Sequence, residues 1–96
     1  MHIISRKALK DFWEKHPDSE EALKAWFKIV NATRYVGYNA LKATFASIDK
    51  VGDKIVFNIG GNKYRLITVI HFNIGRVYIR HVLTHEEYDR GGWKNG

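Results

Sequence analysis

Apolar residues recur at helical spacing in the first part of the chain. Residues 2–5 favour a short strand, and they are followed by a stripe formed by Ala8, Leu9, Phe12 and Trp13. Ser5 precedes this stripe and is a suitable N-cap, whereas Pro17 cannot continue a helix. The pattern therefore predicts a short strand and then a helix that ends at Pro17.

A second helical pattern begins directly after this proline. Asp18 with Glu21 three residues later is close to a capping box, and Glu20 and Glu21 complement the positive end of a helix dipole. The predicted buried stripe consists of Ala22, Ala25, Trp26, Ile29 and Val30, widened by Leu23 and Phe27. So wide a stripe indicates a helix that is packed along much of its circumference.

The middle of the chain has no clean period. Gly37 and two tyrosines within residues 34–39 indicate a connection or a poorly formed helix end. Residues 41–49 fit neither helical nor strand spacing, and we interpret them as a short turn of helix or a loop laid against a sheet.

After Gly52 the pattern becomes strand-like and rich in β-branched and aromatic residues. Strands are predicted at residues 55–59, 63–72 and 76–83, with turns at 60–62 and 73–75. Consecutive hairpins of this kind make an antiparallel meander. Thr84 is placed to cap a last helical turn over residues 85–89.

The order of these elements predicts an α+β fold in a single domain that spans residues 1–96. An N-terminal short strand and two helices should pack on a mainly antiparallel sheet that ends in the three-strand meander. Trp13, Trp26 and Phe27 need the sheet as a surface for burial. The opposite face of the sheet is then left for function.

Charge changes this picture by suggesting a polyanionic partner. The chain has a formal net charge of +6, and residues 54–85 contain no Asp or Glu. That segment holds five Lys or Arg residues and three histidines, namely Lys54, Lys63, Arg65, Arg76, Arg80, His71, His81 and His85. A solvated sheet face would explain such a stretch, but its acid-free length favours nucleic-acid binding.

Several site chemistries are excluded or disfavoured. The chain contains no cysteine, so it has no disulfide, thiolate metal site or cysteine nucleophile. A zinc site from His71, His81 and His85 is disfavoured because His71 lies on a different predicted strand and no His-x-x-x-His pair occurs. We therefore expect no metal and no cofactor. No apolar run approaches the roughly 20 residues that span a bilayer, and no signal peptide is visible, so we expect a cytoplasmic protein.

Three segments carry a specific resemblance: LKATFASID at residues 41–49, VFNIGGNKYRLI at 56–67 and YIRHVLTHEEYD at 78–89. Together they resemble the HigB toxin family, and residues 2–17 look like the first strand and helix of that family. The resemblance implies a RelE-like fold and metal-independent cleavage of mRNA in the ribosomal decoding site. It also implies a HigA-type helix-turn-helix antitoxin as partner, through which the complex would bind operator DNA.

Metal-independent RNA cleavage needs a proton acceptor, a proton donor and cations for the extra phosphate charge. Arg65 is the candidate for holding the phosphate, because its fork matches two phosphate oxygens and the resemblance places a phosphate-binding arginine there. Histidine side chains in general exchange a proton near neutral pH, which makes His85 a candidate. Tyr88 is a candidate either for proton transfer, which a tyrosine performs only where cations assist it, or for stacking on a base. A spacing of three would bring His85 and Tyr88 to one helix face.

Further residues are candidates for RNA binding. Lys63 alternates in phase with Arg65, so both are expected on one sheet face. Either Arg80 or His81 joins them if the third strand is regular, and we favour Arg80. The remaining candidates for RNA contacts are Asn58, which could instead close its strand, and Lys54.

The sequence departs from the wider RelE-like group just before the C-terminal tyrosine. That group often carries basic residues there, whereas this chain has Glu86 and Glu87. Either His85 replaces the missing basic residue, or one of the two glutamates is the base.

Two other kinds of protein remain as alternatives. A non-catalytic module would use the same basic strands to bind RNA or operator DNA. A structural interaction protein would use its basic face only to receive an acidic antitoxin segment.

Overall fold

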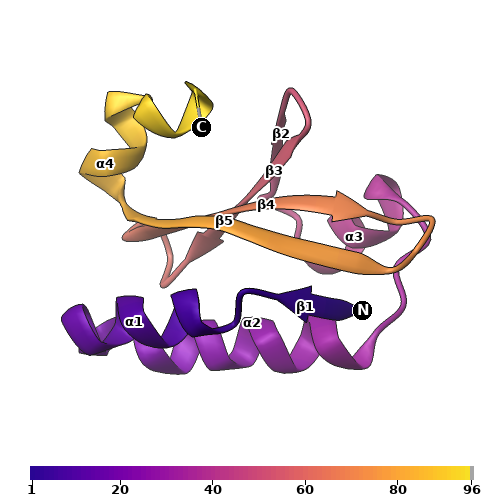
Figure 1. The fold of residues 1–96 in the computed structure, drawn as a ribbon, viewed down its shortest axis with the longest axis horizontal. Helices are drawn as coiled ribbons and strands as arrows, with labels where there is room; N and C mark the ends of the chain where they lie inside the picture. The colour runs from indigo at the N-terminus through magenta and orange to yellow at the C-terminus, as the bar shows by residue number, and fades with distance from the viewer. Residues whose placement is uncertain (96) are drawn as a thin grey trace.

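The structure, a computed structural model, describes residues 1–95 and consists of a five-stranded sheet with helices on both of its faces (Figure 1). The strands are β1 (His2–Ile4), β2 (Asp49–Val51), β3 (Lys54–Ile59), β4 (Tyr64–His71) and β5 (Arg76–Thr84). The helices are α1 (Lys7–Lys15), α2 (Glu20–Ala32), α3 (Tyr38–Thr44) and α4 (His85–Arg90), with short 3-10 turns η1 (Pro17–Ser19) and η2 (Gly92–Asn95). The predicted α+β class is confirmed.

The strand order is β1-β5-β4-β3-β2, so the C-terminal meander lies at the centre of the sheet. Strands β2 to β5 pair antiparallel with their neighbours, and β1 pairs parallel with β5. Helices α1 and α2 run along one face beneath β1 and β5 (Figure 1). The predicted short N-terminal strand is therefore the edge of this sheet.

The main core fills the space between these helices and the sheet. Its fully buried residues include Leu23 and Val30 from α2 and Leu66 from β4, and the Trp26 ring meets that of Phe57 edge-on at 5.4 Å between centroids. Burial of each aromatic or aliphatic side chain of this kind contributes about 1.5–3 kcal/mol to the free energy of unfolding. The predicted burial of the helix aromatics against the sheet is confirmed for Trp26.

The buried stripe of α2 is narrower than predicted. Ala25 is exposed and Ile29 keeps 41% of its surface exposed, whereas Trp26 and Val30 are buried. The helix is packed against α1 and the sheet on one side only, so Ala25 and Ile29 remain at the surface although they belong to the predicted stripe.

Two predicted helix caps were wrong. Ser5 adopts a positive φ of 74°, and it is its carbonyl oxygen that accepts a bond, from the Ala8 N–H at 3.0 Å. Helix α2 begins at Glu20, where no side chain caps it, and Asp18 instead accepts a hydrogen bond from the Tyr64 hydroxyl at 2.6 Å. A tertiary partner has therefore recruited the carboxylate that local spacing assigned to a cap.

The ambiguous segment 41–49 contains the end of α3 and the start of β2. The alternative of a short helical turn is confirmed in part, since α3 spans Tyr38–Thr44, but the three-residue strand β2 was missed. Asp49 and Lys50 of β2 are exposed, and so short a polar strand at a sheet edge gives no apolar alternation to detect.

The second face of the sheet is also partly covered. Helix α4 and η2 lie above the end of β5 (Figure 1), where Val56, Ile67 and Trp93 form a small buried cluster. The expectation that this face is left free is therefore wrong for the half beneath the C-terminal turn. No helix within residues 1–95 is long and apolar enough to cross a membrane.

The bond between Asp18 and Tyr64 ties η1 to β4 and makes stability depend on pH at both extremes. This hydrogen bond holds the pKa of Asp18 below its ordinary 3.8 and raises the pKa of Tyr64 above its ordinary 10.0. Between pH 3.8 and pH 10.0, this hydrogen bond makes its full contribution to the free energy of unfolding. It is lost as pH falls through the lowered pKa of Asp18 and as pH rises through the raised pKa of Tyr64.

Tyr64→Phe should therefore lower the free energy of unfolding most between about pH 4 and pH 10 and should matter less outside that window. Urea denaturation of both proteins across the pH range measures the difference. Tyr35→Phe is the matched control, because Tyr35 is also buried but does not contact Asp18. Parallel pH profiles for wild type and Tyr64→Phe would contradict the assignment.

Candidate functional site

Arg65 lies at the centre of the sheet, on the face turned toward the C-terminal turn. It is paired with Asn58 of β3 on one side and with Leu83 of β5 on the other. Only 9% of its surface is exposed, and its Nη1 donates to the carbonyl oxygens of Asn62 at 3.1 Å and Tyr64 at 3.2 Å. These two bonds fix the guanidinium and leave Nε and Nη2 without a protein acceptor among the described residues.

Tyr88 is stacked beside this guanidinium. The Cζ atom of Arg65 lies 5.3 Å from the centroid of the Tyr88 ring. The same ring stacks on Trp93 at 5.0 Å between centroids and 12° between planes, and the Trp93 indole N–H donates to the Tyr88 carbonyl oxygen at 2.9 Å. The structure thus brings together two of the three predicted catalytic residues, Arg65 and Tyr88.

Trp93 was not among the residues singled out from the sequence. It follows a Gly-Gly pair in an apparently polar tail, so no apolar period marks it. In the structure it is 4% exposed and packs against Val56 and Ile67. Its burial on the sheet is what holds Tyr88 in place.

The start of α4 is fixed by a capping box. The Thr84 backbone N–H donates to Glu87 Oε1 at 2.9 Å, and the Glu87 N–H donates to Thr84 Oγ1 at 3.2 Å. The bond from Thr84 holds the pKa of Glu87 below its ordinary value. The predicted cap at Thr84 is confirmed, and Glu87 is a capping carboxylate, which makes it a poor proton acceptor.

His85 stands at the first position of α4 and is exposed. Its backbone N–H donates to the Lys63 carbonyl oxygen at 3.0 Å, and its Nδ1 lies 2.9 Å from Oδ2 of Asp89. The imidazole therefore makes its polar contact with Asp89 and not with Arg65. Asp89 was missed from the sequence, although its position four residues after His85 is a recognisable helical pairing.

Lys63 does not share the face of Arg65. It precedes β4, and its Nζ lies 3.4 Å from Oδ2 of Asp18 on the helix-covered side, next to the Tyr64 hydroxyl. The prediction from strand alternation was wrong because Lys63 belongs to the turn, where alternation does not apply.

The pairing of β4 with β5 is interrupted by a bulge. Ile67 pairs with His81, whereas the next residue, Thr68, pairs with Ile79. Arg80 is thus an extra residue that has no partner in β4. The bulge, and not the turn at residues 73–75, sets which side chains of β5 face the C-terminal turn.

Both candidates on β5 reach the face of Arg65. His81 lies opposite a β4 residue two positions from Arg65, so the two share a face. Tyr78 pairs with Val69, four positions from Arg65, and the guanidinium of Arg80 lies 5.7 Å from the Tyr78 ring centroid. The expectation that only one of Arg80 and His81 joins Arg65 assumed a regular strand, and the bulge removes that condition.

The two remaining candidates differ in their availability. Asn58 is half-buried and directly opposite Arg65, so its side chain is on the same face. The Lys54 side chain is 13% exposed, and its Nζ lies 3.4 Å from Oδ1 of Asp53. The RNA-binding roles of both residues stay predictions.

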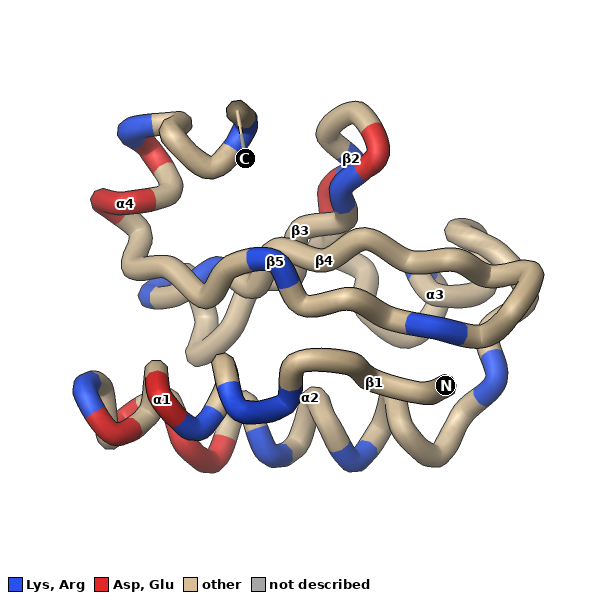
Figure 2. Tube along the Cα trace, viewed as in Figure 1, with Lys and Arg blue, Asp and Glu red and all other residues tan. Residues whose placement is uncertain are grey.

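Charge is distributed unevenly between the two faces. Figure 2 shows blue and red positions intermixed along α1 and α2, whereas β4 and β5 carry Lys or Arg but no acid. Within residues 1–95 no group of three or more His, Asp or Glu side chains gathers in the way a metal ion requires. The arrangement is suited to holding and polarising an anion with arginine and imidazole groups.

The capping box offers a direct test of how α4 is held. Thr84→Val should lower the free energy of unfolding by about 1 kcal/mol, because it removes the acceptor for the Glu87 N–H, and should speed amide hydrogen exchange in α4. Thr44→Val at the exposed end of α3 is the matched control. Equal stability and exchange for Thr84→Val and wild type would show that the cap does not position the site.

Comparison with known proteins finds a family and relatives that all carry the name HigB. A family described as "HigB_toxin, RelE-like toxic component of a toxin-antitoxin system" matches residues 19–91. The chain is 42% identical over 92 residues to the mRNA interferase toxin HigB of Escherichia coli strain K12, which covers 93% of this chain and 88% of that protein. It is 30% identical over 93 residues to the mRNA interferase HigB of Escherichia coli O6:H1 strain CFT073, covering 94% and 90%.

The family match covers β2 to β5 with the bulge, Arg65 and all of α4, which are the parts that build the site. The resemblance found in the sequence is confirmed by the family match and by both relatives. A family of this kind implies an antitoxin partner. The chain belongs to the HigB family of RelE-like toxins from toxin–antitoxin systems.

Proposed function

We propose that this protein is an mRNA interferase that cleaves messages on the translating ribosome without a metal ion. The relatives named as mRNA interferases support the reaction class. The observation that carries the proposal is the contact between the guanidinium of Arg65 and the phenol of Tyr88, at 5.3 Å, on a sheet face whose two central strands carry no acid.

The reaction proposed is attack of a ribose 2′-hydroxyl on the adjacent phosphate. A base takes the 2′-hydroxyl proton, the P–O bond to the next nucleotide breaks, and an acid returns a proton to the 5′-oxygen that leaves. The Nε and Nη2 groups of Arg65 neutralise the charge that builds up on the phosphate oxygens. Because Arg65 is only 9% exposed, the phosphate must enter beside Tyr88, where the phenol stacks on or protonates the substrate.

His85 is the proposed base. Its Nδ1 faces Asp89, which favours the tautomer with the proton on Nδ1 and leaves Nε2 as the proton acceptor. Glu87 is committed to the helix cap, so of the two glutamates only Glu86 remains as an alternative base. His85 is exposed at the rim of the site, where a bound message would be within reach.

The RNA-binding residues proposed around this centre are Asn58, Lys54 and Arg80 on the sheet face, with Lys63 at the turn. Asn58 is opposite Arg65 and is placed to hydrogen-bond a base. Lys63 is exposed beside Asp18 and would contact the RNA strand only at the margin of the site. The proposed inhibitor is a HigA-type helix-turn-helix antitoxin, whose complex with this chain would bind operator DNA. On this proposal the protein works in the cytoplasm, where ribosomes translate.

Substitution of Arg65 or His85 should abolish cleavage without unfolding the protein. We expect Arg65→Ala to lower the cleavage rate on ribosomes by about 100-fold or more, and His85→Ala by a similar factor. Primer extension on a translated message measures the rate, and circular dichroism checks the fold. Arg65→Lys keeps a buried cation but loses the fork, so its failure to cleave excludes simple loss of charge.

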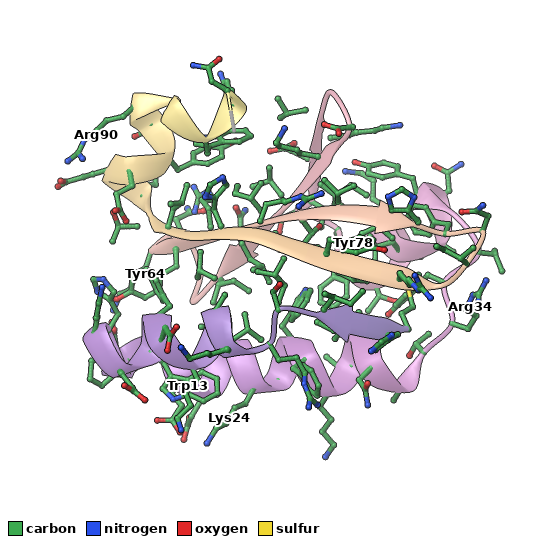
Figure 3. All side chains as sticks on the ribbon, in the orientation of Figure 1. Trp13, Lys24, Arg34, Tyr64, Tyr78 and Arg90 are labelled. Atoms are coloured by element: carbon green, nitrogen blue, oxygen red, sulfur yellow. The ribbon has the colours of Figure 1, made fainter. Side chains whose placement is uncertain are left out.

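Arg90→Ala is the matched control, because Arg90 is exposed on the same helix and points away from the sheet (Figure 3). It should cleave as the wild type does. Full activity of both Arg65→Ala and His85→Ala would refute the site. Binding of RNA with a steep salt dependence but no cleavage in any condition would favour the non-catalytic module.

The absence of a metal step predicts that chelators have no effect. Cleavage in a translation mixture whose ribosomes are already assembled should proceed at the same rate after chelation of trace transition metals, because arginine and imidazole supply the charge and proton transfer. The same message without ribosomes should stay intact. Loss of cleavage on chelation, restored by one added transition metal, would contradict the proposed chemistry.

A further inference from the structure

A second concave region lies on the sheet away from Arg65. Strand β3 pairs with β4 only as far as Thr68, so among the described residues the last part of β4 has no partner on that side. A cavity of about 630 Å³ opens there between the β2–β3 hairpin and the end of β4. Val69 and Ile70 form part of its apolar wall, and Tyr38 of α3 closes one side.

Planar side chains gather at the edge of this cavity. The rings of His71 and Tyr78 meet edge-on, with 5.4 Å between their centroids, and the Arg80 guanidinium lies 5.7 Å from the Tyr78 ring on another side. His71 and Arg80 both line the cavity. Tyr78, labelled in Figure 3, belongs to β5 and lies opposite Val69 of β4. Aromatic rings and guanidinium planes are the surfaces on which unpaired bases stack.

The charge of the cavity is positive and uncompensated. Lys50 on β2 and Arg80 on β5 both line it, and neither has a carboxylate within ion-pair distance in the part of the chain that the structure describes. The one acid among the lining residues is Asp53, which lies 3.4 Å from Nζ of Lys54. An anion in the cavity would therefore lie near two cations, Lys50 and Arg80, that have no carboxylate partner among the described residues.

We propose that this cavity is a nucleotide subsite, in which Tyr78, His71 and Arg80 stack on a base and Lys50 binds a phosphate of the RNA strand that reaches Arg65. The inference deepens the proposed function and rests on it. Val69 lies four residues beyond Arg65 on the same face, about 13 Å away at 3.3 Å per residue. A single-stranded RNA bound along β4 would thus reach both the cavity and Arg65 at once.

Stacking groups favour RNA over an acidic protein segment as the occupant. Carboxylates need only the cations, whereas the cavity adds a row of planar groups beside an apolar wall. Those features match a base and its phosphate together. The competing occupant, an acidic segment of a protein, becomes an outcome of the test.

The test measures binding of a short single-stranded RNA that is 2′-O-methylated throughout, so that it cannot be cleaved. Tyr78→Leu keeps an apolar side chain but removes the stacking surface, and it should weaken binding about 10-fold. Lys50→Gln should weaken binding less and reduce the salt dependence by about one phosphate contact. Lys28→Gln, an exposed lysine on α2, is the matched control and should bind as the wild type does.

Equal binding of the RNA by wild type, Tyr78→Leu and Lys50→Gln would overturn the subsite. A poly-glutamate peptide provides the other arm: if both substitutions weaken the peptide and leave the RNA unaffected, the cavity receives an acidic protein segment and the proposal is wrong. Lys50 is exposed at the sheet edge, so Lys50→Gln is informative even if Tyr78→Leu folds poorly.

Cleavage on ribosomes separates this inference from the proposed function. Tyr78→Leu should raise KM for the message and leave kcat near the wild-type value, because the substitution lies away from the reacting atoms. If the wild type does not cleave but the substitutions still weaken RNA binding, the nuclease proposal fails and the subsite stands. If the wild type cleaves and the substitutions change neither KM nor binding, the subsite fails alone.

Discussion

The burial of Trp93 on the sheet is the interaction on which the rest of the site depends. Trp93 packs on Val56 and Ile67, and its indole N–H bonds back to the carbonyl of Tyr88, so a six-residue helix is held over β4. A helix this short is not stable by itself in water. The capping box and Trp93 together supply the stability that helix propensity does not give so short a helix. They also bring the phenol of Tyr88 to the guanidinium of Arg65.

Arg65 is nearly buried, and this burial fixes the orientation of its guanidinium and limits the side from which it can be reached. Its Nη1 is satisfied by two backbone carbonyls, which hold the group in one orientation while its charge stays unpaired within residues 1–95. A cation fixed in this way has little reorganisation to undergo when a phosphate arrives. On the proposed function, the same burial requires the substrate to enter beside the ring of Tyr88, so one stack of side chains would both recognise the RNA and take part in its cleavage.

The sheet performs two different tasks on its two faces. One face buries the apolar core against α1 and α2, and the other carries arginine, histidine and tyrosine side chains toward solvent and the C-terminal turn. The bulge at Ile67 and Thr68 allows Arg80 and His81 to join the second face together. An irregularity of one residue therefore enriches the face in cations without disturbing the core pairing of β4 and β5.

The sequence by itself determined most of the helices and strands and the basic character of the central strands. Alternation and helical spacing located β3 to β5, α1 and α2, the cap at Thr84 and the basic segment that includes Arg65, because these depend on residues close together along the chain. Only the tertiary structure decided what depends on distant partners: Asp18 bonds Tyr64 instead of capping a helix, Lys63 turns to Asp18, the bulge frees Arg80, and Trp93 seals the site. Local patterns record which face a residue prefers, but a partner far along the chain determines which contact it makes.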